Sequence, residues 1–285
     1  MPLFAVGLLL VAACSHSGWN LILKRINGNY ISMWWGLAIS SLISLPLLFF
    51  RPGIPAQTWL FAAASAVFEA AYYGLLATAY QKEDFSLVYP IARGCAPIFL
   101  AVWSILFLKE TPSAAGVVGL VVLSLGLVIV GSSGWWAARR QNSGSLAGVS
   151  LAFLVALMIS GYSVIDGAAV KFTDPVAYSV LIFTLTTLLI TPLILRQYGW
   201  KKLAEEWHSH PIQDGVIGIL CLVAYLLVLI VFSIAPVSYT GAMREVSIVI
   251  GAIAGWLWLK ESFGLQRLIG AVVIFAGILI IVIKG

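Results

Sequence analysis

Residues 93–134 read RGCAPIFLAVWSILFLKETPSAAGVVGLVVLSLGLVIVGSSG, and the same pattern returns at residues 244–285. The two segments align without gaps and share twelve of 42 positions. Segments of this apolar composition would agree by chance at about a tenth of their positions. Arg93 falls on Arg244, and Glu110 falls on Glu261. The chain therefore contains an internal duplication.

The composition restricts the chain to membrane proteins. Of its 285 residues, 61% are apolar and 9% are charged, whereas a soluble domain is about half apolar and a quarter charged. A soluble enzyme, a disordered chain and a collagen-like chain are excluded. A β-barrel would alternate polar and apolar residues, but the run Gly116–Val130 is apolar on every face. The fold class expected is an all-α polytopic membrane protein.

One bilayer crossing takes about 20 apolar residues, and the chain offers ten such spans. We expect them near 3–23, 31–50, 57–80, 86–108, 113–134, 146–166, 174–195, 213–235, 238–259 and 264–283, with longer connections near 135–145 and 196–212. The duplication then defines two domains of five helices each, at 1–142 and 143–285. Because five is odd, the second copy must enter the membrane from the opposite side. The prediction is two inverted five-helix repeats, a construction of many secondary transporters.

The first span raises a question of processing. Val11–Cys14 is similar to a lipoprotein cleavage box, but Met1–Leu10 lacks the Lys or Arg of a signal peptide. The span also has a counterpart, since Ser17–Trp19 matches Ser160–Tyr162. We therefore expect a mature helix. Connections after odd-numbered spans hold ten Lys and Arg against four on the other side, which by the positive-inside rule places both termini outside.

Several other sites are not expected. The basic residues behind the net charge of +5 are scattered singly, so no nucleic-acid partner is predicted. Cys14, Cys95 and Cys221 lie in apolar spans without nearby His or carboxylate ligands. We expect no catalytic residue, no metal and no cofactor.

Charged groups inside the spans mark the candidate site. Glu69, Arg93, Arg244, Glu245 and His16 each lie well inside a span, where a charge at the helix centre costs about 2.5–3.5 kcal/mol. These side chains must face the interior of the bundle. Seven residues into their spans, the two arginines lie about 10 Å from opposite faces, and so converge on the midplane.

Two interpretations of these groups stay open. The arginines could bind a carboxylate, phosphonate or phosphate bidentately, or they could form structural pairs, Arg93 with Glu245 or Arg244 with Glu69. Glu69 could carry a coupling proton or serve as a counter-ion. Asp166, at the end of its span, is interpreted as an interfacial residue.

Other features surround this centre. Trp19, Asn20, Tyr89 and Tyr239 are candidates to line a cavity. Pro90 and Pro97 weaken the helix around Arg93, which predicts either a hinge or a fixed kink. Glycines spaced by seven, Gly119/Gly126 and Gly270/Gly277, predict close helix packing within the monomer or in a homodimer.

Ten spans, a five-plus-five repeat and a Leu-Lys-Glu turn after the fourth and ninth spans resemble the EamA type of the drug/metabolite transporter superfamily. His16–Asn20, Tyr89–Pro97 and Arg244–Ser247 look like a bacterial subgroup with HAxWN, YPxARGxxP and RExS motifs, although Ser17 departs from the first. The resemblance implies a multi-pass carrier of the bacterial inner membrane, often an exporter of amino acids or related metabolites. Some such members accompany phosphonate-use genes.

The function expected is a secondary-active exporter of small polar metabolites, working by alternating access around a midplane cavity. Its substrate-binding or gating residues are expected to be His16, Trp19, Asn20, Glu69, Tyr89, Arg93, Tyr239, Arg244 and Glu245. Its partners are a small-molecule substrate, the lipid bilayer and a coupling proton. The alternatives are an exporter of cationic drugs, in which the glutamates bind substrate, and a membrane-embedded lipid enzyme.

Overall fold

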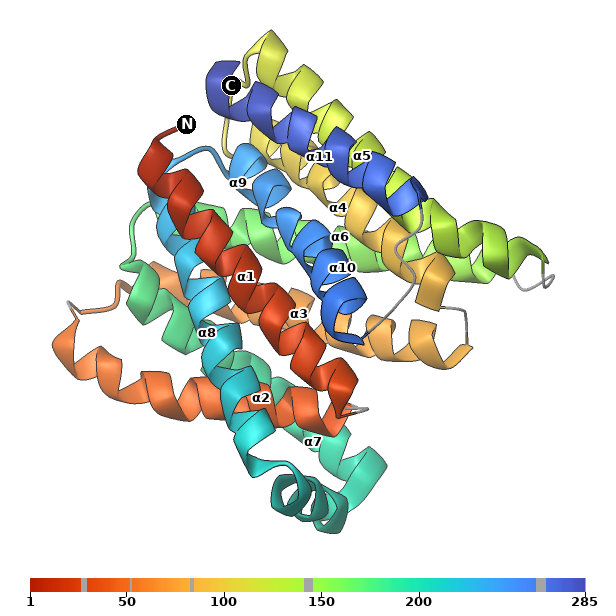
Figure 1. Ribbon diagram of the computed structural model, residues 1–285. Coiled ribbons are helices and arrows are strands. Elements are labelled where there is room, and N and C mark those ends of the chain that lie inside the picture. The colour runs from red at the N-terminus through yellow and green to blue at the C-terminus, as the bar shows by residue number, and fades with distance from the viewer. Residues whose placement is uncertain (27–29, 52, 83–84, 141–145, 260–264, 285) are drawn as a thin grey trace.

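A computed structural model describes residues 1–26, 30–51, 53–82, 85–140, 146–259 and 265–284, with side chains in these ranges except 76–90, 131–147, 252, 255–256, 259 and 267. In the described residues the regular secondary structure is entirely helical (Figure 1). The helices are α1 Leu3–Arg25, α2 Tyr30–Ser44, the 3-10 segment η1 Leu45–Phe50, α3 Ala56–Lys82, α4 Phe85–Phe107, α5 Ala114–Arg140, α6 Leu146–Ala169, α7 Pro175–Ser209, α8 Pro211–Ile234, α9 Val237–Arg244, α10 Val246–Leu259 and α11 Leu265–Lys284. The all-α fold class is confirmed.

Five of these helical stretches are long and apolar enough to cross a membrane, namely Leu3–Arg25, Tyr30–Phe50, Gly148–Ala169, Pro175–Ser209 and Pro211–Ile234. Shorter apolar helices occupy Ile91–Phe107, Ala114–Val130 and Leu268–Lys284. The spans expected from the sequence therefore coincide with helices, because a long apolar run can satisfy its backbone in the bilayer only by forming a helix.

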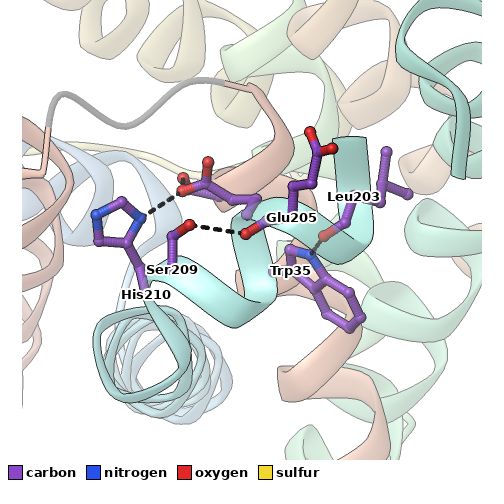
Figure 2. Close-up of polar contacts among 7 residues, drawn as sticks. Trp35, Leu203, Glu205, Ser209 and His210 are labelled. Carbon is purple, nitrogen blue, oxygen red and sulfur yellow. Dashed lines mark hydrogen bonds and ion pairs between the residues drawn. The ribbon is translucent and has the colours of Figure 1, made fainter. Parts of the chain in front are cut away.

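The structure differs from the sequence expectation in one connection and in one span. The predicted connection near 196–212 is largely helical, because α7 continues to Ser209 beyond a kink at Gly199, whose φ of 76° suits glycine. Trp35 donates its indole N–H to the Leu203 carbonyl (2.9 Å) and so holds this extension against α2 (Figure 2). The predicted ninth span is interrupted at Glu245, which separates α9 from α10.

The helix is interrupted at Glu245, whereas α4, which holds the corresponding segment of the first repeat, is not interrupted. Helix α4 is continuous through Pro90 and Pro97, where the sequence left open a hinge or a kink. At Glu245 the backbone hydrogen bonds change from four-residue to three-residue spacing. Glu245 N donates to Ala242 O (3.1 Å), and Ile248 N donates to Glu245 O (3.0 Å). These bonds span three residues, as in a 3-10 turn, and mark a local break in the helix.

The halves of the chain are interleaved. Helix α1 packs against α8 and α10, while α6 packs against α3 and α4. Helices α5 and α11, the last of each half, run side by side (Figure 1). Both termini lie toward the same end of the bundle in Figure 1.

The glycine pairs explain how closely α5 and α11 approach. A Cβ at Gly126 would lie 2.6 Å from the backbone nitrogen of Ile274, and one at Gly277 would lie 2.6 Å from that of Leu123. Both glycine faces are therefore occupied within the monomer. Of the two alternatives left open by the sequence, close packing in the monomer is the one confirmed.

Glu110, in the Leu-Lys-Glu turn, caps helix α9 of the other half. Its carboxylate accepts hydrogen bonds from the backbone nitrogen of Val237 (2.5 Å) and from the nitrogen and hydroxyl of Ser238 (3.2 and 2.6 Å). These are donors that the first turn of a helix leaves unpaired.

We expect Glu110→Ala to lower the free energy of unfolding by about 1–2 kcal/mol, as the loss of a helix cap does. Denaturant titration of purified protein in detergent measures the change. Glu205→Ala, which removes an exposed carboxylate on α7, is the control and should change stability by less than about 0.5 kcal/mol. Equal effects of both substitutions would contradict the capping role.

Candidate functional site

An ion-paired cluster joins the two halves at the break between α9 and α10. Arg93 on α4 places Nε 3.0 Å from Oε2 of Glu245, and Arg244 places Nε 3.8 Å from Oε1 of the same residue. The Glu245 side chain is 0% exposed, and those of Arg93 and Arg244 are 9% and 11% exposed. Two guanidinium groups therefore share one carboxylate, and the trio carries a formal charge of +1.

The pairing predicted between Arg93 and Glu245 is thus present. The other predicted pair is not formed, because Glu69 makes no ion pair within 4 Å in the described part of the chain. Glu69 on α3 instead accepts a hydrogen bond from the hydroxyl of Thr186 on α7 (2.6 Å). It lies within electrostatic range of Arg244 and Asp166.

Helix α1 contributes the aromatic side of the cluster. His16 lies within electrostatic range of both arginines, and its ring meets that of Trp19 edge-to-face at 5.1 Å between centroids. Among the described residues, no hydrogen-bond partner reaches the buried indole nitrogen of Trp19. Ser17 donates to the Ser247 carbonyl (2.6 Å), which ties α1 to the first turn of α10.

The interpretation of Asp166 as interfacial is wrong. Asp166 is 0% exposed, and its carboxylate accepts hydrogen bonds from Ser65 (2.5 Å), Tyr178 (2.9 Å) and Tyr225 (2.6 Å). The three donors come from α3, α7 and α8, so their convergence is a product of the tertiary fold. The sequence signal was the presence of an acid inside an apolar span, which marks Glu69 equally.

Asn20 and Tyr239, which were also predicted for the site, make their hydrogen bonds elsewhere. The amide of Asn20 is exposed and donates to the His16 carbonyl in its own helix (2.7 Å). The hydroxyl of Tyr239 accepts a hydrogen bond from the backbone nitrogen of Ser113 (3.1 Å) at the start of α5. Tyr89 lies in α4, and its side chain is outside the described residues.

The buried charged side chains form a positive region and an acidic region on different helices. Arg93 and Arg244 give a positive region beside α4 and α9, whereas Glu69 and Asp166 give an acidic region between α3, α6 and α7. Tyr162 lies within electrostatic range of all four. Across the described residues, no set of three or more His, Cys, Asp or Glu side chains could hold a metal ion. The chemistry available is the binding of charged groups and of protons.

Three comparisons place the chain among known proteins. The EamA-like transporter family model matches residues 3–132 and 146–283. An uncharacterized transporter of Bacillus subtilis (strain 168), YwfM, is 25% identical over 230 residues, covering 78% of this chain and 73% of that protein. The chain of one crystal structure superposes on this chain with a TM-score of 0.77 at 16% sequence identity, and the match covers 98% of this chain and 96% of that chain. This likeness concerns the fold alone.

The family match covers most of the chain, and the relative is also named as a transporter. A multi-pass membrane transporter is therefore the function established for this chain, in agreement with the expectation that it is not an enzyme. The narrower subgroup with HAxWN, YPxARGxxP and RExS motifs stays a prediction. The chain belongs to the EamA-like transporter family.

Proposed function

We propose that the protein is a secondary-active exporter of small polar metabolites with an anionic group, such as amino acids or phosphonate-like anions, in the bacterial inner membrane. The observation that carries this proposal is the meeting of Arg93 and Arg244, one from each half, on the single carboxylate of Glu245. The trio carries a formal charge of +1, and a planar fork of donors suits a carboxylate or phosphonate.

Alternating access would use the break beside the site. Glu245 lies where α9 ends and α10 begins, so the arginine contacts and the local helix geometry can change together. The reciprocal packing of α1 on α8 and α10, and of α6 on α3 and α4, supports two inverted five-helix repeats at 1–142 and 143–285. Such repeats rock against each other around a midplane site.

An exporter of cationic drugs is the second candidate. It is favoured by the acidic region, because Glu69 and Asp166 are buried and hydrogen-bonded to hydroxyls. In that case the carboxylates would bind the substrate, and Arg93 and Glu245 would serve as a structural pair.

A thermal-shift screen of the purified protein against L-amino acids, aminoethylphosphonate and lipophilic cations distinguishes the exporter of anionic metabolites from the exporter of cationic drugs. A ligand at about 100 times its dissociation constant stabilises the folded state by about 2.7 kcal/mol. We expect stabilisation by the amino acids or the phosphonate that disappears in Arg93→Ala and persists in Arg196→Ala, where the arginine is exposed. Stabilisation by lipophilic cations alone, unchanged in Arg93→Ala, would overturn the proposal.

A further inference from the structure

The carboxylate of Asp166 is enclosed by hydroxyl groups from three other helices. Ser65 of α3 and Tyr178 of α7 donate to Oδ1, and Tyr225 of α8 donates to Oδ2. Asp166 itself is 0% exposed. In the part of the chain that the structure describes, no Lys, Arg or His nitrogen lies within ion-pair distance of it.

This environment suits a carboxyl group that exists in two protonation states. A hydroxyl both donates and accepts hydrogen bonds, so three hydroxyls can donate to the carboxylate. When the carboxyl is protonated, one hydroxyl can turn its hydrogen away and accept the new O–H, and no heavy atom has to move. A buried ion pair lacks this property, because its lysine or arginine has no acceptor.

A second carboxyl, that of Glu69, lies one helical turn from Ser65 on α3. Ser65 and Glu69 are four residues apart on α3, so their side chains share one face about 6 Å apart. Glu69 is bonded to Thr186 on α7, the helix that also supplies Tyr178. The row Asp166, Ser65, Glu69 therefore links the hydroxyl enclosure to a second buried carboxyl.

The charged and titratable groups that interact with Asp166 come from several helices around α6. They are Glu69 from α3, Tyr178 from α7, Tyr225 from α8, Arg244 from α9, and Tyr162 from α6 itself. Arg93 is engaged with Glu245. Of the two cations, Arg244 is the one whose charge acts on Asp166, which couples the carboxyl to the substrate arginines.

We propose that Asp166 is the proton-binding group of the transport cycle and that Glu69 is its neighbour on the proton path. This proposal rests on the proposed function, since it assigns the coupling ion of the same transporter. Binding forms an O–H bond on the Asp166 carboxylate and removes its charge. Release breaks that bond and returns the proton to Glu69 or to water, which restores the charge.

Asp166→Asn tests the proposal, because asparagine keeps the size and an acceptor oxygen but cannot bind the proton. The first readout is infrared spectroscopy of the purified protein, comparing acid with alkaline pH. We expect the acid-minus-alkaline difference spectrum of Asp166→Asn to lack one protonated-carboxyl component that the wild type shows, while the components from Glu69 and the other acids remain. That component should persist in Asp214→Asn, a control at another buried aspartate, on α8.

The second readout uses proteoliposomes, radiolabelled L-amino acids and aminoethylphosphonate. A gradient of about one pH unit supports about tenfold accumulation when one proton is coupled to one substrate. Asp166→Asn is expected to lose this accumulation in both gradient directions. It should keep counterflow, the exchange of substrate for substrate, which needs no net proton movement.

The outcomes separate the two proposals. Accumulation that persists in Asp166→Asn, or a difference spectrum identical to that of the wild type, would overturn the assignment of Asp166. Loss of counterflow together with accumulation, in a variant that keeps the wild-type melting temperature, would assign Asp166 to substrate binding instead. If the wild type transports none of these probes, the proposed function fails for them, and the infrared difference spectrum alone decides whether Asp166 binds a proton.

Discussion

Arg93→Ala is expected to reduce both the stability of the protein and its transport. Removing one partner of a buried ion pair costs about 3–5 kcal/mol, because it leaves a desolvated charge. Arg244 stays 3.8 Å from Glu245, so the loss should fall near the lower end of that range. Denaturant titration in detergent measures the change in the free energy of unfolding.

A second substitution separates the structural role of Arg93 from its role in binding. Glu245→Gln in the same chain removes the carboxylate that has lost Arg93, and it is expected to restore most of the lost stability. Transport should not recover, because the guanidinium that binds the anionic group is still missing. Recovery of transport together with stability would contradict the binding role and leave Arg93 as a structural partner of Glu245.

Gly277→Ala is expected to disrupt the packing of α5 against α11. The new Cβ would lie 2.6 Å from Leu123 N and 2.8 Å from Gly119 O, and backbone atoms cannot move aside as a side chain can. Overpacking of this kind costs about 1–3 kcal/mol, and here it also separates two helices along their contact. The melting temperature of the detergent-purified protein is the measurement.

The matched control for this substitution is Gly7→Ala in α1. A Cβ at Gly7 would meet no heavy atom within 4 Å, and alanine favours a helix over glycine by about 1 kcal/mol. Its melting temperature should be equal to or higher than that of the wild type. A Gly277→Ala protein as stable as the Gly7→Ala protein would show that α5 and α11 are not held in this close contact.

Sequence reasoning predicted the spans well, since each is set by a local run of apolar residues. It did not predict the interruption at Glu245, because no proline or glycine marks that position. Glu245 is instead held by Arg93 of the other half, which is a tertiary contact. At Pro90 and Pro97 the local signal was stronger, yet α4 continues through both, because a membrane bundle can compensate for a missing backbone donor.

The sequence predicted only part of the candidate site. The cost of burying charge identifies Arg93, Arg244, Glu245 and Glu69 as interior residues from their positions alone. The environment of Asp166 depends on hydroxyls from three helices that are far apart in the sequence. No local pattern could reveal that convergence, and an acid near the end of a span resembles an interfacial residue.

The measurement that tests the central claim most directly is counterflow in proteoliposomes. Vesicles loaded with unlabelled L-amino acids or aminoethylphosphonate are diluted into the labelled compound, with wild type, Arg196→Ala and the Arg93→Ala, Glu245→Gln double variant compared at equal amounts of folded protein. We expect labelled substrate to enter with the wild type and Arg196→Ala, and not with the double variant. Equal counterflow by the double variant would show that the arginine cluster does not bind the transported anion.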